Sequence, residues 1–259
     1  MMACVTDNSG EYRLYRDLAQ WWPLISPIEE YEQDAAALAN AFAAASVPVR
    51  EVLDLGSGGG HVAWHLKRRQ LHLTLVDQSA EMIAMSRKLN PDCEHIEGDM
   101  LTIRLGRQFD AVLVHDAVDY VTTEDALLLV AQTAFAHCRP GGIGVFAPDH
   151  TADTFRPGTG GGGGSDFAGR RASFQERTHD PDPADDWIEA DYEFTLHAAD
   201  DSTETVRESH RLGAFRYETW QRVLTAAGFD PEPGNRAAHY AGNGAGPRHL
   251  FIGHRGSSS

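Results

Sequence analysis

The chain has 259 residues, of which 22 are Lys or Arg and 38 are Asp or Glu, so the formal net charge is −16 with histidine neutral. At about 150 residues per domain, this length predicts one large domain, or one domain with an elaboration. A hydrophobic fraction of 42% with 23% charged residues is typical of a globular protein with a sizeable core. The acidic balance disfavours nucleic acid as a partner, because phosphates are bound by basic surfaces.

The three cysteines, Cys4, Cys93 and Cys138, are too few and too scattered for a disulfide framework or a zinc site, so we expect no metal. The amino-terminal residues contain no apolar stretch of the kind found in secretory signals. No segment approaches the roughly 20 apolar residues that a membrane helix needs. These features predict a cytoplasmic protein without a membrane partner.

Two helical segments are expected at the amino-terminal end. Glu11–Gln20 has a helical pattern, and so does the stretch from about Ile28 to Ala45, which is rich in alanine and ends before Pro48. Between them lies an aromatic turn, residues 21–27, with two tryptophans and two prolines. We interpret residues 1–48 as a helical lid.

Short apolar runs then alternate with helical stretches. The runs, bounded by glycine or aspartate, are Glu51–Leu55, His72–Val76, Phe109–Val114 and Ile143–Ala147. The helical stretches between them are His61–Gln70, Ser79–Leu89 and Thr123–Cys138. Continuous apolar runs are typical of parallel strands buried on both faces. The alternation predicts an α/β fold with a doubly wound, mostly parallel, seven-stranded Rossmann-like sheet.

The pattern changes after the fourth of these runs. Ile188–Leu196 and Glu204–Leu212 partly alternate with a period of two, which predicts an antiparallel hairpin, and Phe174–Thr178 is a candidate third strand. The five consecutive glycines at Gly160–Gly164 favour either a disordered linker or the hinge of a lid. We therefore expect an antiparallel β insertion that caps the substrate, residues 150–212.

The carboxyl-terminal part is expected to complete the core. Tyr217–Ala227 has a helical pattern ended by Gly228, and Leu250–Gly253 is a candidate last strand. The predicted cofactor-binding core therefore consists of residues 49–149 and 213–254. Residues 255–259 are interpreted as a disordered tail.

The first strand runs into a glycine-rich turn, Gly56-Ser57-Gly58-Gly59-Gly60. Glycines at such a turn let the backbone approach a ligand that a side chain would block. A dinucleotide site has a third small residue where this chain has His61, and a phosphate-binding P-loop needs Gly-Lys-Ser/Thr, which is absent. The turn therefore favours a nucleoside ligand without a pyrophosphate.

Two acidic residues follow at later strand ends. Asp77 lies 21 positions beyond Gly56, at the end of the second strand, where its carboxylate can accept hydrogen bonds from both hydroxyls of a ribose. Asp99 follows the short apolar run Cys93–Ile96 and can accept from an exocyclic amino group, while Met100 packs on a purine.

These three pieces, in this order, resemble class I S-adenosylmethionine-dependent methyltransferases over roughly residues 50–150. The resemblance implies that the glycine turn faces the amino-acid part of the cofactor, that Asp77 holds the ribose and that Asp99 contacts the adenine amine. The amino-terminal helices, the insertion and the helix from Tyr217 to Phe229 are also similar to the deoxyamino-sugar N,N-dimethyltransferases. The residues expected to contact the cofactor are Tyr15, Gly56, Ser57, Gly58, Gly60, Asp77, Gln78, Met82, Gly98, Asp99, Met100 and His115.

The acceptor is expected beyond the carboxyl ends of the strands, beside His115, Asp116 and His150. Methyl transfer from a sulfonium needs close approach of the acceptor in a dry site, and a base only for a hydroxyl or a protonated amine. Histidine is the candidate base, because its unperturbed pKa lies near neutrality. Tyr120 is a further candidate for this region, and the aromatic residues of the amino-terminal segment either form a lid or simply pack on the sheet.

The sequence thus predicts a methyltransferase that acts on oxygen or nitrogen of a small organic molecule, with S-adenosylmethionine as cofactor and S-adenosylhomocysteine as product. We expect a monomer or a homodimer. Two alternatives are a cofactor-binding protein without catalysis and a nicotinamide-dependent dehydrogenase, which His61 disfavours.

Overall fold

The computed structural model describes residues 12–233, 240–241 and 247–257, apart from the side chains of residues 240, 241 and 247. Its framework is a seven-stranded sheet with the strand order β10-β13-β5-β4-β1-β2-β3. The strands of this sheet are β1 (Glu51–Leu55), β2 (His72–Asp77), β3 (Glu94–Glu97), β4 (Phe109–His115), β5 (Cys138–Ala147), β10 (Asp230–Pro231) and β13 (Phe251–His254).

The first five strands are parallel to one another, whereas β13 is antiparallel to β5 and β10 is antiparallel to β13. The helices of this core are α3 (His61–Leu66), α4 (Ala80–Leu89), α5 (Glu124–His137) and α6 (Tyr217–Ala227), with the short 3-10 turns η5 (Lys67–Arg69) and η6 (Ala117–Tyr120). The predicted doubly wound, mostly parallel α/β fold is confirmed.

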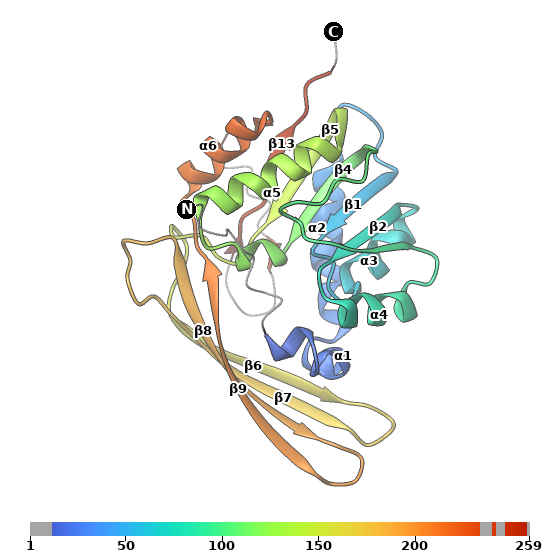
Figure 1. The fold of residues 1–259 in the computed structure, drawn as a ribbon, viewed down its shortest axis with the longest axis vertical. Helices are drawn as coiled ribbons and strands as arrows, with labels where there is room; N and C mark the ends of the chain where they lie inside the picture. Colours follow the sequence, from blue (N-terminus) through green and yellow to red (C-terminus); the bar gives the residue numbers. More distant parts are fainter. Residues whose placement is uncertain (1–11, 234–239, 242–246, 258–259) are drawn as a thin grey trace.

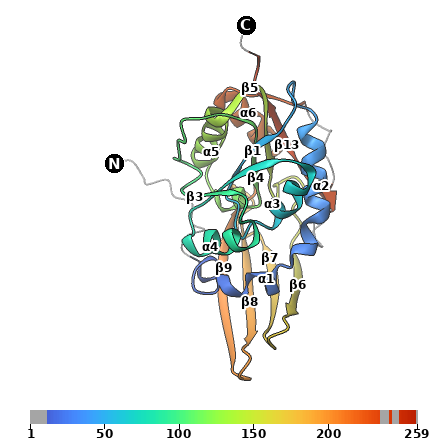
Figure 2. The ribbon, with the colours of Figure 1, turned by 90° about the vertical axis from the view of Figure 1, so that its right-hand side faces the viewer.

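Helices cover both faces of the sheet, and each face has its own hydrophobic core. Figure 2 shows α5 and α6 on one side of the sheet and α3 on the other, where α2 (Glu32–Phe42) lies beside it. Leu127 of α5 and Trp220 of α6 belong to the first core, and Leu38 of α2 and Leu66 of α3 to the second. The fully buried strands of a parallel sheet explain the continuous apolar runs in the sequence.

Two helices, α4 and α5, begin directly after a residue whose side chain caps them. The Met82 N–H donates to the Ser79 hydroxyl at 3.1 Å, and the Ala126 N–H donates to the Thr123 hydroxyl at 3.3 Å. A side-chain oxygen in this position satisfies one of the amide groups that a helix leaves unpaired at its amino-terminal end. Ser79 is therefore the cap of α4, at the start of the helical stretch expected from Ser79 to Leu89.

The amino-terminal segment is less regular than the two predicted helices. It consists of the 3-10 turns η2 (Arg13–Tyr15), η3 (Ala19–Trp21) and η4 (Ile28–Tyr31), and of the helices α1 (Trp22–Ile25) and α2. The first predicted helix is wrong over its described residues, because Arg16 leaves the helical region with φ −120° and ψ −110°. The aromatic stretch expected to be a turn contains α1, with Pro23 in its first turn, where proline is tolerated.

The insertion forms a separate four-stranded antiparallel sheet in the order β6-β7-β8-β9. Its strands are β6 (Gly158–Ser165), β7 (Arg171–His179), β8 (Trp187–His197) and β9 (Thr203–Gly213). Figure 1 shows this sheet extending away from the core, with α1 between the two. The predicted hairpin is confirmed, and the candidate third strand is β7.

The five glycines are neither a linker nor a hinge, because they form the middle of β6 and pair with β7 without interruption from Gly158 to Ser165. Ladder hydrogen bonds use backbone groups, which glycine has like any other residue. The Phe174 ring of the neighbouring strand covers Gly162, because a Cβ added to this glycine would lie 3.1 Å from the ring. An aromatic ring over a glycine in this manner compensates for the missing side chain.

Two short strands, β11 (Tyr240–Ala241) and β12 (Pro247–Arg248), pair near the end of the chain. At the start of the predicted disordered tail, Arg255 donates to the Phe135 carbonyl at 2.7 Å and to the Cys138 carbonyl at 2.5 Å. Arg255 is therefore held against α5, which corrects the prediction for this residue. Residues 258–259 lie outside the described part of the chain.

Candidate functional site

The glycine turn after β1 has the conformation that requires glycine. Gly56 and Gly58 have φ values of +79° and +53°, in the region that other residues rarely adopt. The N–H groups of Gly56 and Ser57 both donate to the Val76 carbonyl, at 2.8 and 2.9 Å, which ties the turn to β2. A Cβ at Gly56 would lie 2.2 Å from the Ala117 Cβ. The turn therefore packs directly on the segment that follows β4.

Asp77 faces the glycine turn, as the spacing predicts. Its carboxylate accepts from the Gly58 N–H at 2.7 Å and from the Ser79 N–H at 2.9 Å. Burial raises the pKa of Asp77, and these backbone hydrogen bonds act in the opposite direction. Two amide donors fix the orientation of the carboxylate and leave lone pairs on both oxygens for further donors.

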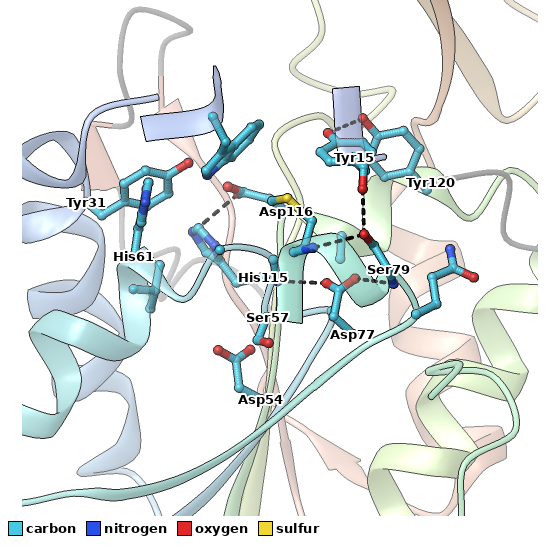
Figure 3. Close-up of a pocket in the computed structure, with 18 residues that line it drawn as sticks. Tyr15, Tyr31, Asp54, Ser57, His61, Asp77, Ser79, His115, Asp116 and Tyr120 are labelled. Carbon is cyan, nitrogen blue, oxygen red and sulfur yellow. Dashed lines mark hydrogen bonds and ion pairs between the residues drawn. The ribbon is translucent and has the colours of Figure 1, made fainter. Parts of the chain in front are cut away.

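A cavity that is partly open to solvent lies between this turn and the amino-terminal segment (Figure 3). It is lined by Tyr15, Trp22, Tyr31, Asp54, Gly56, Ser57, Gly58, Gly59, His61, Val62, Asp77, Gln78, Ser79, Met82, His115, Asp116, Ala117 and Tyr120. We call it the first cavity. The predicted site residues in this lining are Tyr15, Gly56, Ser57, Gly58, Asp77, Gln78, Met82, His115 and Asp116.

The other predicted site residues do not line the first cavity. Asp99 accepts from the Leu101 N–H at 2.8 Å and so stabilises its own turn, and Met100 is buried in the core beside it. A Cβ at Gly60 would lie 2.3 Å from the Ser86 hydroxyl, so this glycine allows α3 to approach α4. Gly98 and His150 also lie outside the lining. The roles of these residues stay predictions.

Asp54 lines the first cavity from β1 and was not among the predicted site residues. Its side chain is buried, and burial, together with the charge of Asp77, raises the pKa of Asp54 to about 7. The signal was a carboxylate inside an otherwise apolar and buried strand. The Ser57 hydroxyl in the same wall is buried without a hydrogen-bond partner among the described residues. Buried polar groups of this kind favour a polar ligand.

The raised pKa of Asp54 predicts a specific pH dependence of stability. The folded state retains the Asp54 proton up to about pH 7, whereas the unfolded chain loses it near 3.8. The resulting stabilisation is present at low pH and is lost as the pH rises between these values. We expect Asp54→Asn to gain up to about 4 kcal/mol relative to the unmodified protein between pH 4 and 7.

Urea unfolding at several pH values measures this difference in the free energy of unfolding. The matched control is Asp201→Asn, at an exposed turn residue with φ +65°, a conformation that asparagine tolerates. The control should not reproduce this gain. A constant difference between Asp54→Asn and the unmodified protein over this pH range would contradict the raised pKa.

A second cavity of about 950 Å³ adjoins the first. It is lined by Leu14, Tyr15, Trp22, Ile25, Ser26, Glu30, Tyr31, Asp34, Asp116, Asp119, Tyr120, Asp149, Phe174, Glu176, Tyr192, Phe194, Leu212 and Arg248. The residues shared by the two linings are Tyr15, Trp22, Tyr31, Asp116 and Tyr120. The four-stranded sheet and the amino-terminal segment thus enclose a space next to the glycine turn.

The shared wall is mainly aromatic and carries one carboxylate. The Ser79 hydroxyl donates to the Tyr15 carbonyl at 2.5 Å, which fixes the amino-terminal segment to the start of α4. Asp116 has φ +51°, a strained conformation for this residue type that is common at functional sites. Aromatic faces and carboxylates both attract cations. The wall therefore suits a positively charged group, such as a sulfonium, between the two cavities.

Most of the charged side chains that line the second cavity are carboxyl groups. Arg248 Nη1 lies 2.6 Å from Asp149 Oδ1 and 3.3 Å from Asp116 Oδ1. Burial, followed by the charge of Asp149, raises the pKa of both Asp116 and Asp119 well above the usual range. Burial likewise raises the pKa of Asp34 to about 6. A bound cation would stabilise the charged form of these groups.

The two predicted bases differ in position. His115 lines the first cavity, and its Nε2 lies 3.3 Å from Asp116 Oδ1. Burial lowers the pKa of His115 to about 3, so the side chain is neutral and a weak proton acceptor. His150 contacts Phe155 edge-on, with ring centroids 5.5 Å apart, and burial lowers its pKa too. Their role as bases stays a prediction, which these pKa shifts weaken.

Within the described ranges, no cluster of three or more His, Cys, Asp or Glu side chains has the geometry to hold a metal ion. No helix there is long and apolar enough to cross a bilayer.

The family model and the relatives that this chain matches are all described as methyltransferases. Residues 52–142 match a family model described as a methyltransferase domain. The chain is 27% identical over 230 residues to the dTDP-3-amino-3,6-dideoxy-alpha-D-glucopyranose N,N-dimethyltransferase of Streptomyces fradiae, covering 87% of this chain and 86% of the relative. A second relative is the dTDP-3-amino-3,4,6-trideoxy-alpha-D-glucopyranose N,N-dimethyltransferase of Streptomyces venezuelae, 24% identical over 87% of this chain and 91% of that one.

Solved structures show the same fold. DesVI of Streptomyces venezuelae superposes with a TM-score of 0.74 at 22% identity, over 88% of this chain and 92% of that one. The S-adenosylmethionine-bound amino pentose methyltransferase CalS10 of Micromonospora echinaspora has a TM-score of 0.71 at 24% identity, over 87% and 91% of the chains. The predicted resemblance to methyltransferases of this fold is confirmed.

Proposed function

We propose that this chain, a small-molecule methyltransferase that uses S-adenosylmethionine, transfers the methyl group to the nitrogen of an amine, and that the amine is an amino sugar. The sequence alone left oxygen and nitrogen open. The observation that carries the choice of nitrogen is the second cavity, where six carboxyl side chains and one arginine line the wall. An ammonium group relieves the repulsion among these carboxyl groups, whereas a neutral hydroxyl does not.

We assign the cofactor to the first cavity. Asp77 faces the glycine turn with an oriented carboxylate, and Asp54 and Ser57 add polar groups in the same wall. We assign the ribose to Asp77 and the amino-acid part to the glycine turn, as the resemblance implies. When bound, the cofactor supplies an activated methyl group on a sulfonium. The role of the protein is then to exclude water and to hold the acceptor at attack distance.

The aromatic wall shared by the cavities positions the acceptor. Tyr15 and Tyr120 lie in both linings, and their hydroxyls are 2.5 Å apart. Tyr31 is held in place by a hydrogen bond of 2.7 Å with the Ser26 hydroxyl. The amino-terminal segment is thus a lid that separates the reacting atoms from solvent. A cytoplasmic location and a monomer or homodimer remain part of this proposal.

The test compares two acceptors that differ in one group. The protein is incubated with S-adenosylmethionine and either dTDP-3-amino-3,6-dideoxy-α-D-glucopyranose or the same sugar nucleotide with a hydroxyl in place of the amine. Mass spectrometry should detect methylation of the amine only. The free amino sugar, without its nucleotide, shows whether the nucleotide is needed. The proposal would be contradicted if the hydroxyl compound were methylated as fast as the amine. It would also be contradicted if neither the amino sugar nucleotide nor the free amino sugar were methylated.

A further inference from the structure

A continuous line of hydrogen bonds leads from the shared wall into the four-stranded sheet. The Tyr15 and Tyr120 hydroxyls are 2.5 Å apart, and the Tyr120 hydroxyl lies 3.0 Å from His210 Nδ1. On the other side of the ring, His210 Nε2 lies 3.4 Å from Glu208 Oε2. The four side chains come from three separate segments, namely η2, η6 and β9. We call this series the Tyr15–Glu208 relay.

The relay is buried and its far end is anchored. His210 is 0% exposed and Tyr120 8%, so water does not replace their hydrogen bonds. The N–H groups of Arg13 and Leu14 donate to the Glu208 carboxylate at 2.7 and 3.2 Å. These donors and His210 lower the pKa of Glu208, against the effect of burial. Glu208 is therefore an anion that can stabilise a proton on the imidazole.

The two ends of the relay open in different directions. Tyr15 and Tyr120 line both cavities, where the acceptor nitrogen and the methyl group meet. Glu208 borders a separate polar hollow of the four-stranded sheet, whose lining also includes Thr159 and Ser209. Burial raises the pKa of both tyrosines, so each keeps its hydroxyl proton at rest. A hydroxyl can accept one proton while it donates another.

We propose that the Tyr15–Glu208 relay carries a proton from the acceptor ammonium to the outside of the second cavity each time a methyl group is transferred. The inference rests on the proposed function, because an amine that arrives as an ammonium has no lone pair for attack. Tyr15 and Tyr120 are the catalytic residues of the relay, since they line the site. His210 and Glu208 are positioning residues that act through Tyr120.

The proton balance is complete. The ammonium N–H gives its proton to the Tyr15 oxygen as the Tyr15 proton passes to Tyr120 and the Tyr120 proton to His210 Nδ1. The freed nitrogen lone pair forms the new N–C bond while the C–S bond breaks and its electron pair stays on sulfur. His210 then gives its Nε2 proton to Glu208, which returns it to solvent. Before the next transfer His210 tautomerises, so that its remaining proton is again on Nε2, and the Tyr15 and Tyr120 hydroxyls turn back to their resting direction. One proton leaves for each methyl group transferred.

The first test does not depend on turnover. The relay requires the His210 tautomer in which Nε2 carries the proton and Nδ1 accepts from Tyr120. Nitrogen NMR of the ¹⁵N-histidine-labelled protein with S-adenosylhomocysteine reports this, and the His210 signals are identified by their loss in His210→Asn. A proton on Nδ1 would overturn the relay. The titratable groups that face His210 are Tyr12, Tyr15, Tyr120, Tyr192 and Glu208.

The second test measures kcat with dTDP-3-amino-3,6-dideoxy-α-D-glucopyranose. Tyr120→Phe and His210→Asn each interrupt the relay and should lower kcat about 100-fold at neutral pH, with the KM for S-adenosylmethionine unchanged. The matched control is Tyr12→Phe, because the Tyr12 ring also packs on His210, with centroids 3.7 Å apart, but its hydroxyl accepts from the Arg211 N–H. The control should stay within about twofold.

The pH profile separates a relay from a structural role. At high pH the acceptor arrives as a free amine, so the rates of Tyr120→Phe and His210→Asn should recover toward that of the unmodified protein. A loss of equal size at every pH, or wild-type kcat at neutral pH, would contradict the relay. If the unmodified protein does not methylate the probe, the proposed function fails, while the tautomer still decides whether the relay exists.

Discussion

Replacing Asp77 with alanine is expected to weaken the binding of S-adenosylhomocysteine about 100-fold. Hydrogen bonds to a charged group contribute about 1.5–3 kcal/mol each, and loss of both proposed ribose contacts, partly replaced by water, leaves a deficit of about 3 kcal/mol. The carboxylate also accepts from the Gly58 and Ser79 N–H groups. Removal of the carboxylate therefore destabilises the glycine turn as well as weakening the binding of the ligand.

Isothermal titration calorimetry measures this loss, and two variants separate its causes. Asp77→Asn keeps one side-chain oxygen for the backbone donors but removes the charge, so it should bind with intermediate affinity. Asp99→Ala tests the second predicted acid, whose carboxylate accepts from the Leu101 N–H and the Thr102 hydroxyl. Unchanged affinity in Asp77→Ala would remove the basis for the cofactor assignment. A large loss in Asp99→Ala would show that the adenine extends beyond the first cavity.

Local signals in the sequence were sufficient for the core of the fold. The four predicted apolar runs lie within the parallel strands β1, β2, β4 and β5, and the residues that cap or end a helix, such as Ser79 and Gly228, lie at its boundary. The glycine turn follows β1, and Asp77 is the last residue of β2. These two strands pair directly, from Glu51 with His72 to Leu55 with Val76. Their proximity therefore follows from the chain order of a doubly wound sheet.

The acceptor side of the site could not be predicted in the same way. Tyr120 and His210 are 90 positions apart in the sequence, and they meet because β9 packs against η6. Nothing local to β9 distinguishes a buried histidine in a relay from one on an alternating strand. The pKa of His115 likewise depends on burial, which lowers it to about 3 and which residue type does not reveal.

The glycines of β6 illustrate the limit of composition as evidence. A run of glycine is typical of a flexible linker, because glycine loses more conformational entropy on folding than other residues. In this chain the pairing with β7 and the Phe174 ring over Gly162 offset that entropy. The strand and the ring come from another part of the chain, so the glycine run by itself does not predict them.

Gly56→Ala is expected to lower the free energy of unfolding by about 4 kcal/mol and the Tm by about 10 °C, and to abolish cofactor binding at ordinary concentrations. The new Cβ would lie 2.2 Å from the Ala117 Cβ, and overpacking of this kind costs about 1–3 kcal/mol. The positive φ of +79° adds a further strain of about 1–3 kcal/mol. Both effects act on the turn that faces the first cavity.

Two further variants separate the backbone strain at this position from the steric clash. Gly106→Ala places a Cβ at a glycine with φ +69° and no atom within 4 Å, so it measures the backbone strain alone. Gly56→Ala combined with Ala117→Gly removes the clash but keeps the strain. We expect the double variant to regain about half of the lost stability in thermal unfolding and to bind S-adenosylhomocysteine again. If Gly56→Ala were no less stable than Gly106→Ala, the close packing of the glycine turn on η6 would be wrong, and with it the shape of the cavity wall.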